Sequence, residues 1–290
     1  MVVQTSTTQE LIQSQIQKVL TLPLEQESTF LSSGVRVIDS ASPVRFPKLS
    51  ADDSAVGYTA EGANIPQDDV DFSEVALMPS TMQSFKRIIP VTHEALRTAT
   101  LDLSGIIQSA LVRWMSTKTD AAFYGDGGDG VTTIKGVFAQ AGTQTLPVGA
   151  ALSLSAVKAA TALALKAHVD TSALRLFLTP EDFVSLQNEE DADGRGLLQP
   201  DATQGYSWRA AGVPIVVTDR LPDDDETTPA GRALLADMSK AVVVRDIQSV
   251  TILKEALATS GKVGLSAAAR FDMGLLVPEA FVTLTGITRA

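Results

Sequence analysis

The segment AAFYGDGGDG, residues 121–130, contains the spacing in this chain that is nearest to a chemical motif. Gly125, Gly127 and Gly130 match G-x-G-x-x-G, the pattern that lets a backbone approach the pyrophosphate of a dinucleotide. That motif must follow a strand and open a helix, because the amides and the positive dipole of a helix N-terminus attract phosphate. Here the glycines follow a predicted helix and are interspersed with aspartates. We therefore interpret the segment as a turn, with Gly125 as a left-handed residue that ends the helix.

Other residues suited to catalysis or metal binding are few. His93 and His168 are the only histidines and have no H-x-x-x-H spacing, and the chain has no G-x-S-x-G element. The absence of cysteine excludes disulfides and thiolate chemistry. The acidic run Asp223–Glu226 is interpreted as a solvated turn. We predict no catalytic residue, cofactor or metal site, while a Ser-His-Asp arrangement and a site of histidines and carboxylates stay open.

Composition places the chain among ordinary globular proteins. It has 290 residues, 44% hydrophobic and 20% charged, and a formal net charge of −11. This acidity argues against broad binding to nucleic acid or to anionic membranes, both of which attract basic surfaces. No signal peptide and no stretch long enough to span a bilayer is visible, so we expect a soluble protein.

Two N-terminal segments have no apolar cover near them in the sequence. Residues 1–34 are predicted to form an arm with an amphipathic helix that ends at Pro23 and buries its stripe either on its own domain or on another chain. Residues 35–50 are predicted to be extended. Residues 51–85 carry seven acidic residues and no lysine or arginine. Their alternation at Val56 and Tyr58, and again at Val75 and Leu77, predicts a long β-hairpin, which we expect to be functional.

The rest of the chain predicts one long helix and then a mixed α/β layer. Apolar residues repeat at helical spacing from Asp102 to Tyr124, with Thr100 or Asp102 as the cap. Helices and strands alternate over residues 131–245, including a helix that starts at Thr179-Pro180 and a strand at Ala241–Val244. Strand patterns return over residues 246–285.

The order of these pieces and several short strings resemble the major capsid proteins of tailed bacteriophages, which have the Hong Kong 97-like fold. The strings before the long helix and at its two ends are Tyr58–Ala63 with Ile65-Pro66, Val75–Pro79, Ile88–Thr92, Glu94–Leu96, Asp102-Leu103, Ala122–Gly127 and Gly136-Val137. The later strings are Asp193–Arg195, Ala211–Pro214, Thr218, Ala236-Asp237, Val244–Asp246 and Ala280–Val282. Each string is weak alone, but together they cover nearly the whole chain in order.

The resemblance implies an α+β fold with an N-terminal arm, an extended hairpin loop, a peripheral domain with a long spine helix and an α/β axial domain. The corresponding ranges are 1–34 for the arm, 51–85 for the loop, 35–50, 86–130 and 246–272 for the peripheral domain, and 131–245 and 273–290 for the axial domain. The candidate intersubunit residues are Ile12, Ile16, Leu20, Tyr58, Glu61, Asp68, Asp69, Asp71, Glu74, Arg87 and Arg97. The candidate domain junction is Gly125, Asp126, Gly127 and Gly130.

The resemblance also implies function and partners. The chain is expected to form hexamers and pentamers of an icosahedral virion shell, assembled in the cytoplasm of a bacterial host, that encloses double-stranded DNA without reading its sequence. Portal and scaffolding proteins, and a cement protein in some shells, are the implied partners. An encapsulin nanocompartment and a soluble α/β enzyme are the alternatives.

Two features depart from some members of that family. Some relatives join their subunits by isopeptide bonds between a lysine of the extended loop and an asparagine of the peripheral domain. Residues 51–85 contain no lysine, and Asn64 and Asn188 are the only asparagines, so we predict no cross-links. The sequence before the loop is short for a fused scaffolding domain, so we expect a separate scaffold or assembly guided by the arm.

Overall fold

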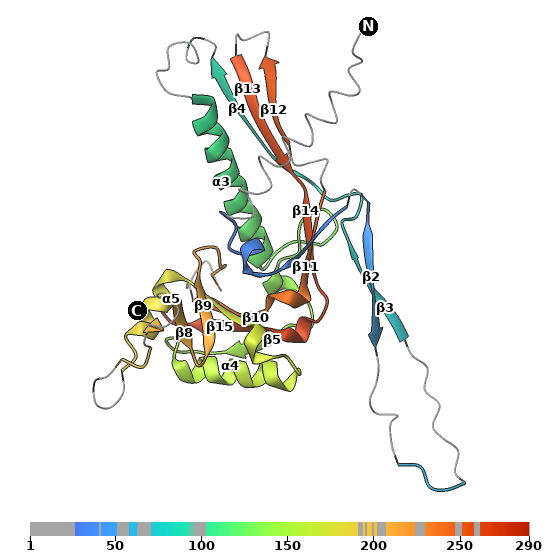
Figure 1. The fold of residues 1–290 in the computed structure, drawn as a ribbon, viewed down its shortest axis with the longest axis vertical. Coiled ribbons are helices and arrows are strands. Elements are labelled where there is room, and N and C mark those ends of the chain that lie inside the picture. The colour runs from blue at the N-terminus through green and yellow to red at the C-terminus, as the bar shows by residue number, and fades with distance from the viewer. Residues whose placement is uncertain are drawn as a thin grey trace.

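The computed structural model describes residues 27–40, 42–50, 58–62, 71–92, 94, 103–190, 194, 196–198, 200–201, 207–223, 230–246, 251–257 and 262–289. Its largest unit is a seven-stranded mixed sheet in the order β5-β15-β10-β6-β9-β8-β7 (Figure 1). The strands are β5 (Gln144–Pro147), β6 (Leu174–Leu178), β7 (Pro200–Asp201), β8 (Ser207–Ala210), β9 (Val213–Val217), β10 (Gly231–Asp237) and β15 (Phe281–Ile287). The helices α4 (Leu154–Lys166) and α5 (Pro180–Gln187) accompany this sheet.

Two three-stranded sheets extend from this unit toward the long helix. One has the order β1-β11-β14 and contains β1 (Arg36–Asp39), β11 (Ala241–Arg245) and β14 (Phe271–Leu275). The other has the order β12-β13-β4 and contains β12 (Thr251–Leu257), β13 (Lys262–Ala269) and β4 (Phe85–Thr92). The helix α3 (Leu103–Tyr124) runs beside β4 and β13 (Figure 1) and confirms the long helix predicted from the sequence.

The strand at Ala241–Val244 was expected in the α/β layer, and the structure corrects this. β11 pairs in parallel with β1 and antiparallel with β14, so it belongs to a different sheet from β10, which precedes it. Every residue of β11 is buried, as in a strand covered on both faces. An apolar run of this kind predicts a buried strand but does not identify its neighbours.

The predicted hairpin exists, but its first strand lies earlier in the chain than expected. β2 (Val44–Ser50) pairs antiparallel with β3 (Asp71–Leu77), whereas Tyr58 lies outside any strand. Pro47 is tolerated because both strands of a two-stranded ribbon are edges, where some amides have no partner to lose. The hairpin therefore includes Arg45 and Lys48, which lie outside the range expected to form it.

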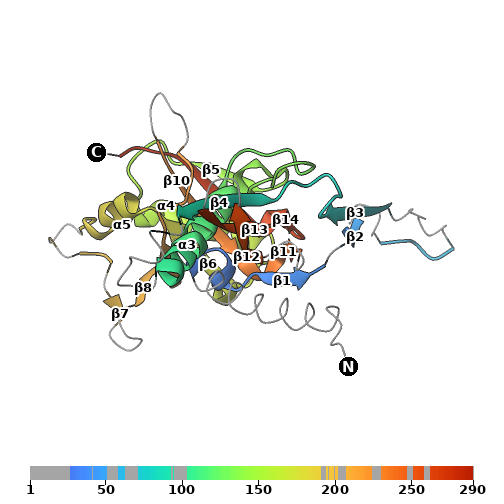
Figure 2. The ribbon, with the colours of Figure 1, turned by 90° about the horizontal axis from the view of Figure 1, so that it is seen from above.

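Short 3-10 helices complete the fold at Leu31–Ser33, Val137–Ala139, Thr171–Ala173, Met238–Lys240 and Pro278–Ala280. A cluster of aromatic rings joins the sheets to α3. Phe30 lies 4.9 Å from Phe123 and 5.2 Å from Tyr124, measured between ring centroids. Tyr124 contacts Phe177 of β6, and Phe123 contacts Phe271 of β14. The core is therefore continuous from the seven-stranded sheet to the spine helix, and the hairpin extends from the opposite side of the molecule to α5 (Figure 2).

Candidate functional site

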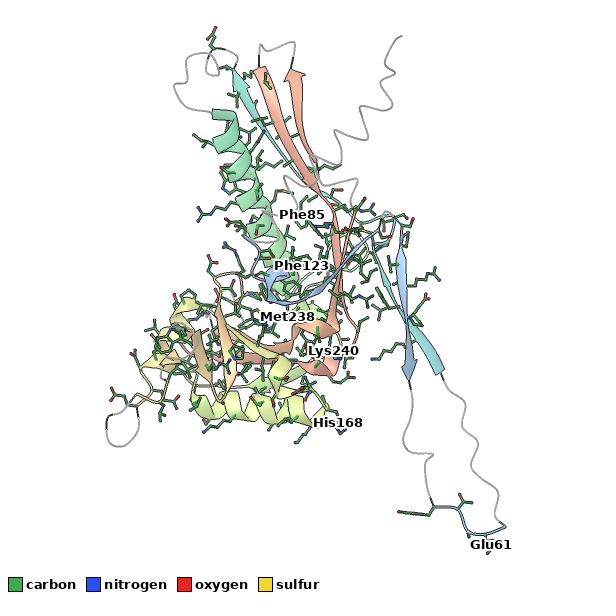
Figure 3. The ribbon with its side chains drawn as sticks, in the orientation of Figure 1. Glu61, Phe85, Phe123, His168, Met238 and Lys240 are labelled. Atoms are coloured by element: carbon green, nitrogen blue, oxygen red, sulfur yellow. The ribbon has the colours of Figure 1, made fainter. Side chains whose placement is uncertain are left out.

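The predicted contact residue Glu61 lies at the far end of the hairpin, away from the body of the molecule (Figure 3). Tyr58 is fully exposed, at 111% relative exposure, and Glu61 is exposed as well. Glu74 forms an ion pair with Arg45 across the two strands, with 3.3 Å between Nη1 and Oε1. Both side chains are more than half exposed, so the pair stabilises the hairpin by less than about 1 kcal/mol. Nothing in the described chain covers Tyr58.

Of the other three acidic candidates, Asp71 is the first residue of β3, where its backbone pairs with Ser50. Asp68 and Asp69 lie outside the described residues.

The root of the hairpin is held firmly, in contrast to its tip. Leu77 and Met78 are buried, and Met78 has a left-handed backbone, with φ of 60°. Its amide donates to Oδ2 of Asp272 at 2.6 Å. Asp272 also accepts from the Met273 amide at 2.8 Å. Burial raises the pKa of Asp272, opposed by these amide bonds and by the charge of Arg270.

A second contact packs the hairpin root against the body. A Cβ added to Gly274 of β14 would lie 2.7 Å from Cδ2 of Leu77 and 3.1 Å from Cγ1 of Val75. The side chains of Leu77 and Val75 on β3 therefore pack directly against Gly274, and a larger residue there would require them to move.

The C-terminal part of the predicted arm, at Ser28 and Thr29, is fastened to the spine helix by Asp120. Asp120 is 1% exposed and accepts a hydrogen bond from the Ser28 hydroxyl and from the amide of Thr29, at 2.8 Å in the second case. The Thr29 hydroxyl also donates to it at 3.1 Å and lies 3.3 Å from the Thr218 hydroxyl beyond β9. Burial raises the pKa of Asp120, opposed by these hydrogen bonds. Asp120 therefore joins residues 28–29 to α3, and the Thr29 hydroxyl extends this contact to Thr218, which follows β9.

The arm residues Ile12, Ile16 and Leu20 lie outside the described residues, as do Arg97 and the predicted caps of α3. Arg87, the remaining basic candidate, lies on β4 with its guanidinium 4.1 Å from the ring centroid of Trp114 on α3. Within its own chain Arg87 thus stacks on the spine helix, and it pairs with none of the described acids of the hairpin. A contact of this type contributes about 0.5–1 kcal/mol at an exposed site.

The apolar stripe of α3 is only partly covered. Leu111 and Met115 are buried, but Ile106 and Trp114 are 52% and 40% exposed, and Ile88 on β4 is 49% exposed. The predicted stripe is therefore buried at Leu111 and Met115, while Ile106 and Trp114 offer apolar surface. The buried face of the helix also includes polar side chains, Asp120 among them, which its apolar periodicity does not indicate.

The glycine-rich segment follows α3 directly, so the requirement for a helix that starts there is not met. Gly125 is not left-handed, which corrects the predicted cap; Gly128 and Gly130 adopt positive φ instead. Glycine is required at Gly136, because a Cβ there would lie 2.1 Å from the Gly125 carbonyl oxygen. The two backbones touch where the chain returns past the end of the helix.

The two aspartates of this segment have structural partners. Asp126 pairs with Arg232 of β10 at 3.0 Å, which ties the end of α3 to the seven-stranded sheet. Asp129 accepts hydrogen bonds from the amides of Val131, Thr132 and Thr133 at 2.8–3.0 Å. Hydrogen bonding, led by the Thr133 amide, holds the pKa of Asp129 well below its usual range. These contacts shape a turn between α3 and the seven-stranded sheet.

The C-terminal strand ends in a charged cluster that sequence analysis did not identify. Arg289 donates to Asp223 Oδ1 at 2.7 Å and lies 3.4 Å from Asp182 Oδ1 and 3.2 Å from the Thr179 hydroxyl. Asp223, expected in a solvated turn, is therefore engaged in an ion pair, and Asp224–Glu226 lie outside the described residues. The cluster fixes the end of β15 to the start of α5.

Among the described residues, no group of three or more histidine, cysteine or acidic side chains is arranged to hold a metal ion. His93 lies outside them, and His168 has a left-handed backbone after α4. No helix in the described part of the chain is long and apolar enough to cross a membrane.

Comparison with known proteins identifies one family over most of the chain. The model of the phage capsid family matches residues 9–286. The search of curated proteins found no match. Among solved structures, the chain resembles the capsid of a native GTA particle, with 16% identity, a TM-score of 0.67 and 88% of each chain covered.

Two further structures are similar to a comparable degree. One is from Microbacterium phage Oxtober96, with 18% identity, a TM-score of 0.67 and coverage of 89% of this chain and 90% of the other. The other is the holo-SrpI encapsulin complex from Synechococcus elongatus, with 11% identity, a TM-score of 0.67 and coverage of 89% and 87%. At these identities the likeness shows a common fold.

Proposed function

The chain belongs to the phage capsid family, and from that premise we propose that it builds the icosahedral head of a tailed phage. Its copies assemble as hexamers and pentamers around double-stranded DNA. The chain is thus a structural shell protein, and its chemistry is that of noncovalent assembly. The hairpin is the observation that carries this proposal.

The hairpin supports assembly because its anchoring is asymmetric. Its root is buried against β14 and held by Asp272, whereas Tyr58 at its far end is fully exposed. A two-stranded ribbon is at best marginally stable alone, and a neighbouring subunit supplies the surface it lacks. Ile106 on α3 and Ile88 on β4 add exposed apolar area for the same purpose.

Expression of the chain, followed by negative-stain microscopy and light scattering, tests assembly directly. We expect closed shells of uniform diameter built from many copies. A monodisperse monomer or dimer, under conditions in which the subunit is folded by circular dichroism, would contradict the proposal. The expected scaffold protein is co-expressed in a parallel sample, because the family resemblance implies one.

The likeness to an encapsulin supports a second candidate within the same fold, a shell for protein cargo. The contents of particles purified from their natural source distinguish the two. Nuclease-protected double-stranded DNA supports the phage head, and a protein cargo without DNA supports the nanocompartment.

We further propose that the shell retains DNA without binding it tightly. The net charge of −11 is compatible with this, because a strongly basic lining would bind phosphates and release counterions. Portal, scaffolding and cement proteins are the proposed partners in the virion, with assembly in the bacterial cytoplasm. Residues 125–130 are the proposed junction of the peripheral and axial domains.

A further inference from the structure

A charged contact ties the end of the spine helix to the seven-stranded sheet, between Asp126 and Arg232 of β10. The Oδ2 atom of Asp126 lies 3.0 Å from Nη1 of Arg232, whose side chain is only 11% exposed. The guanidinium of Arg232 also lies over the ring of Phe138, 5.4 Å from the centroid, within the range of a cation–π contact. Arg232 therefore contacts both the start of the glycine-rich turn and the 3-10 helix that follows it.

The backbone of the sheet is irregular at Arg232. Where the pairing of β10 with β15 shifts register, Thr285 and Gly286 of β15 both lie opposite Arg232. Gly286 has a left-handed backbone, with φ of 68°, which glycine adopts without a steric penalty. Bulges of this kind bend a strand, increase its local twist and re-aim side chains. The direction in which Arg232 leaves the sheet is therefore built into the backbone.

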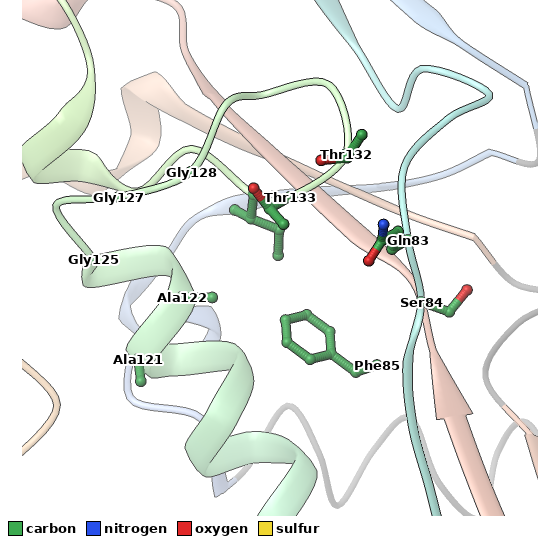
Figure 4. Close-up of a pocket in the computed structure, with 11 residues that line it drawn as sticks. Gln83, Ser84, Phe85, Ala121, Ala122, Gly125, Gly127, Gly128, Thr132 and Thr133 are labelled. Carbon is green, nitrogen blue, oxygen red and sulfur yellow. The ribbon is translucent and has the colours of Figure 1, made fainter.

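Asp126 is held just as firmly on the side of the spine helix. The chain leaves α3 at Gly125 and turns through Gly127 and Gly128 (Figure 4). A Cβ on Gly136 would lie 2.1 Å from the Gly125 carbonyl oxygen, and the Gly136 amide donates to the Gly127 carbonyl at 3.2 Å. Both neighbours of Asp126 thus contact the returning chain, which fixes the carboxylate relative to the end of the helix.

Other contacts between α3 and the sheet define its direction less closely. Tyr124 packs on Phe177 of β6, with 5.7 Å between the ring centroids, and the burial of apolar surface is non-directional. The hydroxyls of Thr29 and Thr218 are 3.3 Å apart, and each can rotate to suit the other. A pocket of about 450 Å³ borders the glycine-rich turn (Figure 4), so side chains do not pack tightly against the turn on that side.

We infer that Arg232, through its pair with Asp126, is a positioning residue that sets the angle between the spine helix and the seven-stranded sheet, and with it the curvature of the shell. The 22 residues of α3 span about 33 Å, so a rotation of about 5° at one end moves the other end by about 3 Å. Subunits that meet their neighbours through both parts would then close at a different diameter. This inference rests on the proposed function and names the contact that sets the size of the shell.

Removal of the Asp126 carboxylate tests this role. In Asp126→Ala the Arg232 guanidinium loses its anion at the end of the helix, whereas the matched control Asp219→Ala breaks an ion pair of two adjacent residues, Asp219 and Arg220. Shell diameters are measured by electron microscopy, and the melting midpoint of unassembled subunits is measured in parallel. We expect folded Asp126→Ala subunits to lose the single diameter and to form shells of mixed size or unclosed sheets. The control should give shells of the native diameter.

The outcomes separate this inference from the proposed function. Asp126→Ala shells of the single native diameter overturn the positioning role, even if the melting midpoint falls, and leave the shell function intact. Mixed diameters in the control as well also overturn it, because the effect would then not depend on the link to the helix. If Asp126→Ala does not fold by circular dichroism, Asp126→Asn is judged by the same criteria, since it removes the charge and keeps the shape. Absence of shells from the native chain contradicts the proposed function itself.

Discussion

At the scale of single residues, Asp120 illustrates how one buried carboxylate joins distant parts of the chain. It accepts hydrogen bonds from Ser28 and from two groups of Thr29 at 1% exposure. Asp120→Ala would leave these donors without partners, at a cost of about 1–3 kcal/mol. We expect it to lower the free energy of unfolding of unassembled subunits by about that amount. Asp120→Asn keeps one acceptor oxygen and should cost less; chemical denaturation compares the two variants.

The pH dependence of stability, compared between the native chain and Asp120→Asn, gives an independent check. Burial raises the pKa of Asp120 above its ordinary 3.8, so the folded state binds the proton more tightly than the unfolded state. The resulting stabilisation is full below about pH 3.8 and is lost as the pH rises through the folded pKa. The stability of the native chain relative to Asp120→Asn should therefore decrease with rising pH across that window. Asp272, whose pKa is also raised, is present in both proteins and cancels. A relative stability that increases with pH would contradict the assignment.

Local residue patterns were predictable from the sequence, whereas long-range partners were not. Thr179 caps α5 with Pro180 at its first turn, as predicted, because a cap depends only on neighbours in the chain. Asp120 and Asp272 were missed, since their partners lie 92 and 194 residues away. The left-handed cap at Gly125 was wrong because the glycines of this turn serve a close backbone approach at Gly136.

At the scale of elements, periodicity located strands and helices but not their pairing. The predicted helix from Asp102 to Tyr124 and the strand containing Val75 and Leu77 are present as α3 and β3. The partner of β3 was misplaced, because alternation shows that a strand has two faces and says nothing about its neighbour. β11 joined an unexpected sheet for the same reason.

Because β3 packs closely against β14, a substitution at Gly274 tests whether shell assembly depends on the position of the hairpin root. Gly274→Val would place methyl groups where Leu77 and Val75 now lie and so displace the hairpin root. We expect folded subunits, with a native circular dichroism spectrum, that form few or malformed shells by microscopy. Gly196→Ala is the matched control, since a Cβ there meets nothing within 4 Å. Normal shells from Gly274→Val would mean that assembly tolerates a displaced hairpin.

At the scale of the whole molecule, the shell must be held either by covalent links or by interlocked surfaces. The structure changes one premise of our prediction, because Lys48 lies on β2 and the hairpin therefore does contain a lysine. Our prediction of no cross-links then depends on the second partner that the family resemblance implies, an asparagine. Asn188 is the C-cap of α5, a helix that lies on the opposite side of the molecule from the hairpin (Figure 2), and Asn64 lies outside the described residues.

We therefore expect shells of this protein to be held by noncovalent contacts, chiefly those made by the hairpin and the apolar surface of α3. Mature particles boiled in denaturant should release a single band near 30.6 kDa on a gel, because noncovalent contacts between subunits are lost when the subunits unfold. A ladder of heavier bands would contradict this. Lys48→Arg would then identify the donor, since arginine keeps the charge but has no amine that forms an isopeptide bond. If that variant lost the ladder, Lys48 would be the linked residue; if the ladder persisted, the link would arise from another lysine.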